Sequence, residues 1–227
     1  MDNEKIEKLQ ENIIPATNQN NQPVYFYGDG KGFKIMFVGN SIAKHKPKPE
    51  MGWTNDCGMA ASSIDKDYVH LIVDKCKKEY REDTSFCICQ IASYEVTRNP
   101  AILEEKYSSV KDYNPDVVIM FFGANVPKEY DTEEKHEFPF GEAYEILRNY
   151  LNGDHTLFFH SDGFYIRPVL DEEKKIVAAK YGDTYINIED IRTREDTHGR
   201  FNHPSDLGMA EIADRFWNAI IKKLKES

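Results

Sequence analysis

Three short segments of the chain carry the residue types that acyl transfer requires. They are Gly39-Asn40-Ser41, Gly123-Ala124-Asn125 and His203-Pro204. A serine hydroxyl attacks a carbonyl when a base takes its proton, and a histidine can supply that base. The developing oxyanion needs fixed donors, which an asparagine amide and backbone N–H groups provide. Ser41, His203 and Asn125 are therefore a candidate nucleophile, general base and oxyanion donor, provided that the fold brings them together.

The elements that must position these segments form an alternating series. Short apolar runs predict five strands, at 33–38, 85–91, 117–122, 156–159 and 185–188, and a small edge strand at 25–27. Helical spacing of apolar residues predicts helices at 4–12, 58–80, 142–151, 171–181 and 206–225. This alternation indicates an α/β fold, an open parallel sheet with helices on both faces. Ligands bind such sheets beyond the carboxyl ends of the strands, where Ser41 and Asn125 lie.

At these segments the sequence resembles the SGNH hydrolases, also called the GDSL family. The Gly39–Ser41 segment is similar to the family's nucleophile turn, and the Gly123–Asn125 segment to the block whose asparagine lines the oxyanion hole. His203, with Pro204 and Gly208 after it, is similar to the block of the general base. The resemblance covers about residues 33–225. It implies a three-layer α/β/α sandwich with a five-stranded, parallel, flavodoxin-like sheet. We expect one domain over 1–227, with residues 1–30 as an N-terminal extension packed on the core.

Two positions depart from the family's pattern. Arg200 stands where the family usually has an aspartate that orients the histidine. Either another carboxylate serves, with Asp196 favoured over Glu195, or a Ser–His dyad uses a backbone carbonyl. The second-block glycine, a backbone oxyanion donor, is absent from residues 90–97. A backbone N–H in the segment 92–95 can still donate, and Ser93 is the candidate.

Other residues near these segments have a functional and a structural interpretation. His45, Trp53 and Glu95 are candidates for substrate binding, and His160 is a further candidate for the edge of the site. Most aromatic residues serve packing, however. The structural interpretations are that Ser41 caps a helix, Asn125 ties a loop and His203 is a surface residue, and the three segments together favour the functional ones. His198 is a rival for the base. No recognised metal-ligand spacing occurs, so we expect no metal and no cofactor.

Composition narrows the class of protein. The chain has 227 residues, a net charge of −10 and 40% hydrophobic residues, which is typical of a globular domain. The acidic balance argues against a nucleic acid as the main partner. No apolar run approaches the roughly 18 residues of a membrane span, and we see no signal-peptide stretch near the start. The four cysteines match no zinc or redox motif, which favours free thiols in the cytoplasm. We expect a monomer or homodimer acting on a small-molecule ester.

Three functions compete at this stage. The first is a serine esterase that hydrolyses small acyl esters, such as acetyl groups on carbohydrates, through Ser41 and His203, with Asp196 as the candidate third member. The second is an inactive or weakly active domain of the same fold that binds a glycan or another small ligand, which the missing aspartate motivates. The third is a flavin or nucleotide binder of flavodoxin-like architecture. The segment after the first long strand offers one hydroxyl and no phosphate-binding glycine pattern, which argues against the third function.

Overall fold

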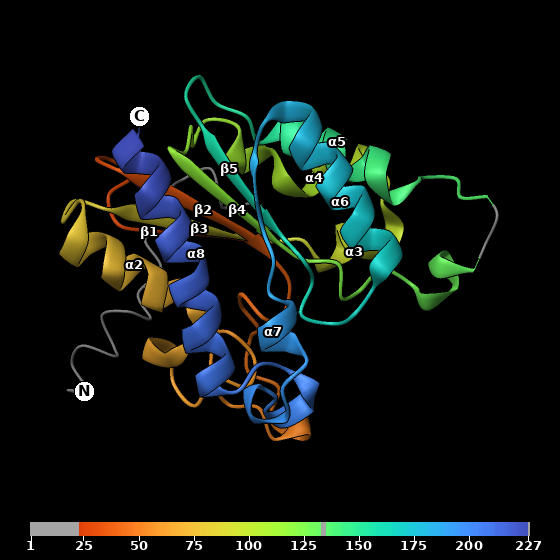
Figure 1. The fold of residues 1–227 in the computed structure, drawn as a ribbon, viewed down its shortest axis with the longest axis horizontal. Coiled ribbons are helices and arrows are strands. Elements are labelled where there is room, and N and C mark those ends of the chain that lie inside the picture. The colour runs from red at the N-terminus through yellow and green to blue at the C-terminus, as the bar shows by residue number, and fades with distance from the viewer. Residues whose placement is uncertain (1–22, 133–134, 227) are drawn as a thin grey trace.

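The computed structural model describes residues 23–132 and 135–226, and its centre is a six-stranded sheet (Figure 1). The strands lie in the order β1-β3-β2-β4-β5-β6. They are β1 Val24–Tyr27, β2 Lys34–Gly39, β3 Ser85–Gln90, β4 Val117–Phe121, β5 Leu157–Ser161 and β6 Thr184–Ile186. Strands β2 to β6 are parallel, as predicted, whereas β1 pairs antiparallel with β3 at one edge. The flavodoxin-like class with five parallel strands is confirmed, and the small edge strand predicted at 25–27 is β1, which makes six strands in the sheet.

Helices cover both faces of this sheet (Figure 1). One layer consists of α2 Tyr68–Glu79 and α8 Asp206–Glu226. The other consists of α3 Ala92–Thr97, α4 Ala101–Tyr107, α5 Phe140–Tyr150 and α6 Pro168–Tyr181, and the short helix α7 is Glu189–Arg192. Along β2, Ile35 and Phe37 face the first layer while Met36 and Val38 face the second. Both faces of the strand are buried, which explains why its sequence is apolar throughout rather than alternating.

The predicted helices differ from the observed ones mainly around the nucleophile turn. The helix predicted over 58–80 begins only at Tyr68. The Asp67 carboxylate accepts the His70 N–H at 2.8 Å and the Gly58 N–H at 3.0 Å, so it caps α2 and holds the preceding segment as a loop. Helices α3 and α4 were not predicted, because each is shorter than the window in which helical spacing can be recognised.

The topology brings the three chemical segments to one edge of the sheet. Strand β2 lies between β3 and β4, with Gly39 opposite Gln90 on one side and Phe121 on the other. The residues that follow these three strands therefore leave the sheet at the same level. The strand order changes direction at β2, since β3 lies on one side of it and β4 on the other, and ligands bind such sheets at this switch point.

Several expectations concern other parts of the chain. The helix predicted at 4–12, and most of the proposed extension 1–30, lie outside the described residues. All four cysteines are buried free thiols. Within residues 23–132 and 135–226, no helix has the length and apolar character of a membrane span.

Candidate active site

Ser41 lies in a tight turn directly after β2. The Asn40 carbonyl accepts the Ala43 N–H at 3.0 Å, and the Asn40 side-chain oxygen accepts the Ile42 N–H at 3.1 Å. A Cβ atom on Gly39 would lie 2.7 Å from the Ala43 Cβ, so only glycine fits the start of this turn. The turn leaves Ser41 partly exposed while its neighbours Asn40 and Ile42 are buried. This is the geometry that a nucleophile needs.

The structure brings Ser41 and His203 into direct contact. The Ser41 Oγ lies 2.7 Å from the His203 Nε2, and the His203 Nδ1 lies 2.8 Å from the Phe201 carbonyl oxygen. A carbonyl only accepts, so Nδ1 carries the ring proton and Nε2 of the neutral ring accepts from the serine hydroxyl. Burial lowers the pKa of His203 from its ordinary value. The ring is therefore neutral near pH 7 and in the tautomer that a general base requires.

The acceptor at the His203 Nδ1 is the backbone carbonyl of Phe201, and Asp196, the favoured carboxylate for this place, lies elsewhere. The Asp196 carboxylate is exposed and binds Arg194, at 2.9 Å and 3.1 Å, and Arg194 also binds Glu211. The pKa of Asp196 is lowered by its hydrogen bonds to Arg194. Asp196 is thus committed to a surface ion pair because it has a guanidinium two residues away. Of the two alternatives for orienting the histidine, the geometry matches the dyad with a carbonyl.

The loop before His203 has an unusual backbone that aims this carbonyl. Phe201 has φ 58° and ψ 22°, and Asn202 has φ 56°, so two consecutive non-glycine residues adopt the left-handed conformation. Arg200 donates to the Gly52 carbonyl at 3.0 Å and lies over the Phe201 ring. The rival histidine, His198, is bound to the Arg192 carbonyl and the Asn202 side chain and has no contact with Ser41 among the described residues.

A buried glutamate holds the asparagine of the predicted oxyanion hole. Glu95 is 1% exposed, and its Oε2 accepts the Asn125 Nδ2 at 2.6 Å. Its Oε1 accepts the Gly123 N–H at 2.5 Å and the Asn40 Nδ2 at 3.0 Å. Burial raises the pKa of Glu95, and the hydrogen bonds from Asn125 and Asn40 oppose that rise. The Asn125 amide has two N–H groups, so one is fixed by Glu95 and the other can donate to an oxyanion.

This location corrects the expectation that Glu95 contacts substrate, because the carboxylate has no exposed surface to offer. The sequence contained a signal for the buried position. Glu95 lies four residues after buried Ile91 and next to buried Tyr94, on the inward face of α3. Glu95 therefore contributes to the site by fixing Asn125, Gly123 and Asn40.

Within residues 92–95, the Ser93 N–H is the backbone donor left for an oxyanion, although this segment lacks the family's glycine. Ala92 donates its N–H to the Gln90 side chain at 3.2 Å, and Tyr94 and Glu95 donate theirs to the Ile91 carbonyl. The N–H of Ser93 lies in the first turn of α3, where helices supply no internal acceptor. The Ser93 hydroxyl is occupied differently, at 2.9 Å from the Tyr107 hydroxyl.

Three aromatic residues were predicted at the edge of the site, and they differ in exposure: Trp53 and His160 are buried, and His45 is partly exposed. Trp53 is 3% exposed, packs against Phe201 and donates its indole N–H to the His45 carbonyl at 3.1 Å, so it supports the loops instead of facing substrate. His160 is fully buried between Tyr144 and an aspartate, away from any rim. His45 is partly exposed and close enough to His203 to help lower its pKa. Only His45 of these keeps a position at which substrate contact is feasible.

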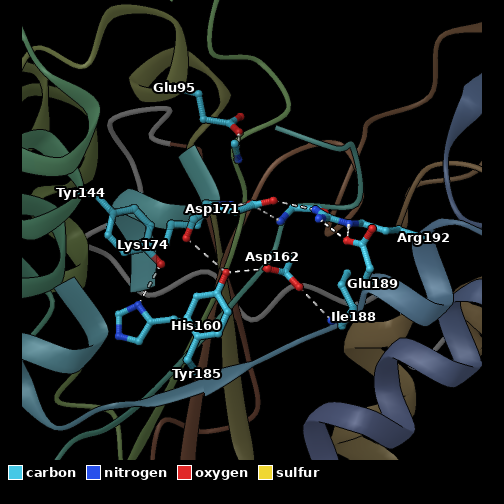
Figure 2. A network of polar contacts seen from close by, with 12 residues as sticks. Glu95, Tyr144, His160, Asp162, Asp171, Lys174, Tyr185, Ile188, Glu189 and Arg192 are labelled. Carbon is cyan, nitrogen blue, oxygen red and sulfur yellow. Dashed lines mark hydrogen bonds and ion pairs between the residues drawn. The ribbon is translucent and has the colours of Figure 1, made fainter. Parts of the chain in front are cut away.

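A buried ionic network is centred on Asp171, as Figure 2 shows. Asp171 binds the Lys174 Nζ at 3.1 Å and the Arg192 guanidinium at 2.7 Å. Burial alone would raise the pKa of Asp171, but Lys174 and Arg192 outweigh it and lower the pKa. A Cβ atom on Gly123 would lie 3.2 Å from the Lys174 Nζ, so this lysine is packed under the turn that carries Asn125. Sequence reasoning missed this network, because each member lies in a helix or loop without a recognisable motif.

A metal site is not evident in the part of the chain that the structure describes. Residues 23–132 and 135–226 contain no cluster of three or more histidine, cysteine or carboxylate side chains that could hold an ion.

No protein-family model and no curated protein matches the sequence. Comparison with solved structures does find proteins of similar fold. A family two carbohydrate esterase from Clostridium thermocellum, solved with cellohexaose, superposes with a TM-score of 0.54 at 17% identity; the match covers 85% of this chain and 65% of that one. A two-domain esterase active on acetylated mannans has a TM-score of 0.54 at 18% identity, over 87% of this chain and 51% of that one.

A third similar structure is a candidate GDSL-like lipase from Bacteroides ovatus. It has a TM-score of 0.56 at 14% identity, over 85% of this chain and 100% of that one. The match therefore spans the whole of this neighbour and between half and two thirds of the two esterases. At these identities the comparisons establish a common fold.

Proposed function

This chain has the SGNH/GDSL hydrolase fold, and we propose that it is a serine esterase that hydrolyses small acyl esters, such as acetyl groups on a carbohydrate. One observation carries the proposal, namely the 2.7 Å contact between the Ser41 Oγ and the His203 Nε2 with the His203 Nδ1 held by a carbonyl. The two esterase neighbours, one solved with cellohexaose and one active on acetylated mannans, support the carbohydrate part.

The proposed reaction begins when Ser41 attacks the ester carbonyl and His203 takes the serine proton at Nε2. The imidazolium that forms is stabilised by the Phe201 carbonyl at Nδ1. The negative oxygen of the tetrahedral intermediate accepts from the Ser41 N–H, the Ser93 N–H and the Asn125 amide. His203 then gives its proton to the leaving alcohol, and water, activated by the same ring, releases the acid from Ser41.

The preference for a small acyl group comes from the sequence around the site. It contains no long apolar segment of the kind that would cover a fatty acyl chain. The residue that follows Ser41, Ile42, is buried in the core and is not available to line an acyl site.

Labelling with a fluorescent fluorophosphonate tests the proposal, because this probe reacts with activated serines. Wild type should be labelled stoichiometrically at Ser41, as read by mass spectrometry, and Ser41→Ala should not be labelled. Ser63→Ala is the matched control, since the Ser63 hydroxyl binds the Asp65 carboxylate two residues away. Wild type that has not been treated with the probe should hydrolyse acetylated sugars and p-nitrophenyl acetate faster than the corresponding longer acyl esters.

Folded wild type that is not labelled at Ser41 would contradict the proposal. The alternative function, a domain of the same fold that binds a glycan without turnover, would then be tested by calorimetry with oligosaccharides.

A further inference from the structure

Tyr165 lies in the segment after β5 and contacts His203. No sequence motif had pointed to this tyrosine. The Tyr165 hydroxyl lies 3.3 Å from the His203 Nδ1, and the two rings meet edge to face at 84° with centroids 6.2 Å apart. Nδ1 carries the ring proton, because its closer partner is the Phe201 carbonyl at 2.8 Å. The tyrosine oxygen is therefore a second acceptor for the same N–H, in a three-centre hydrogen bond.

The hydroxyl has a free proton of its own in this arrangement. Burial raises the pKa of Tyr165 to about 12, with a smaller contribution from Glu95, so the phenol is neutral at pH 7. Its oxygen accepts from His203, and none of the described residues accepts the phenolic proton. The His203 ring is thus held by two neutral oxygen dipoles in place of the single carboxylate that an aspartate would supply.

The segment that carries Tyr165 is fixed at both ends. The preceding residue, Phe164, is 2% exposed and packs against the His198 ring at 4.7 Å. The Arg167 guanidinium binds Asp131 and donates to the Val126 carbonyl at 2.8 Å. Tyr165 therefore stands on a rigid support that also holds the turn after Asn125, so one segment contacts both the base and the loop of the oxyanion donor.

We propose that Tyr165 is a positioning residue for His203, whose hydroxyl, together with the Phe201 carbonyl, replaces the missing aspartate as the acceptor for the Nδ1 proton. This rests on the proposed esterase function. The role differs from that of a carboxylate in one respect. Neutral acceptors hold the ring in its reactive tautomer and stabilise the imidazolium, but they add no negative charge behind it.

The proposal predicts how Tyr165→Phe behaves, since this variant keeps the ring and removes only the hydroxyl. We expect kcat to fall about three- to tenfold, the effect of one neutral hydrogen bond, with KM unchanged. An acceptor on Nδ1 favours the protonated ring, so its loss should also move the acidic limb of the kcat/KM profile to lower pH. Among the described residues, His45 also lowers the pKa of His203, and the charged Arg200 lies over the neighbouring Phe201 ring; both remain in the variant.

The experiment measures kcat, KM and the pH profile for wild type, Tyr165→Phe and Tyr181→Phe. Tyr181 is the matched control, because its hydroxyl binds Glu145 and Asn149 at the surface. A lower kcat together with a displaced acidic limb supports the role. An unchanged kcat and profile overturns it, and so does a lower kcat with an unmoved limb and a reduced melting temperature, which indicates a structural effect only. Absence of Ser41 labelling in wild type would instead overturn the esterase function itself.

Discussion

Glu95→Gln is the change that best separates positioning from chemistry at this site. Glutamine has the size of glutamate, but one carboxylate oxygen becomes an NH2 group. If that group faces Asn125, two donors meet where the Glu95 Oε2 and the Asn125 Nδ2 now lie 2.6 Å apart. If it faces the other way, it meets the Gly123 N–H and the Asn40 amide instead. Either orientation breaks at least one buried hydrogen bond of the site.

The magnitude follows from what Asn125 does. Complete loss of one oxyanion donor costs about 10²–10³ in kcat, which is the expected effect of Asn125→Ala. Glu95→Gln leaves the amide present but unfixed, so we expect a smaller loss, about 10- to 100-fold, on the same scale. An unsatisfied buried donor should also lower stability by about 1–3 kcal/mol. The acetyl esterase assay gives kcat, and thermal unfolding gives the change in stability.

A double-mutant cycle decides whether Glu95 acts through Asn125. In the Asn125→Ala background, Glu95→Gln should lower kcat by less than about threefold, because its target is already gone. Glu145→Gln, which removes a surface carboxylate bound to Lys180, is the control and should leave kcat unchanged. Two effects that simply multiply would refute the reasoning. So would a faster Glu95→Gln enzyme, which would mean that the buried negative charge opposes the oxyanion more than the hydrogen bond helps it.

Two further predictions concern the histidine. Asp196→Asn should change kcat by less than about twofold in the same assay, since Asp196 binds Arg194 and not His203 and exposed ion pairs contribute little; a large loss would restore Asp196 as the orienting group. Because burial lowers the pKa of His203, the acidic limb of kcat/KM should lie below pH 6.5, the ordinary value for histidine, and a limb above it would contradict the geometry. The same shift means that the unfolded chain binds this proton more readily. The stability from neutral His203 is therefore present above about pH 6.5 and decreases as pH falls below it, which thermal unfolding between pH 7 and 5 would measure.

The fold was predictable because its strands are apolar on both faces and alternate with helices. The boundaries of α2 were not, since the Asp67 cap that starts this helix has no distinctive pattern among several nearby aspartates and serines. Ser41, Asn125 and His203 were found because their side-chain types carry the chemistry and each lies at a strand end or helix start. Glu95 was found as a residue of the site but placed wrongly, because a carboxylate near a site is normally solvated and only its helical position indicates burial.

The group that orients His203, the Phe201 carbonyl, could not be predicted from the sequence. Every residue has a carbonyl, so no residue type marks the one that faces Nδ1. What distinguishes Phe201 is its left-handed backbone, a conformation that costs about 1–3 kcal/mol for a residue with a side chain and persists only when the surroundings hold it. Trp53 packs against the Phe201 ring, and Arg200 ties the loop to the Gly52 carbonyl.

Arg200 therefore has a role at the position where the family has its aspartate. Its guanidinium fastens the strained loop to the segment around Gly52, and the strain turns the Phe201 carbonyl toward His203. The charge that an aspartate would place beside the imidazole is thus replaced by a backbone dipole whose direction depends on contacts between distant segments. An aspartate at this position could not replace the anchor to Gly52, because a carboxylate has no N–H to donate to the Gly52 carbonyl.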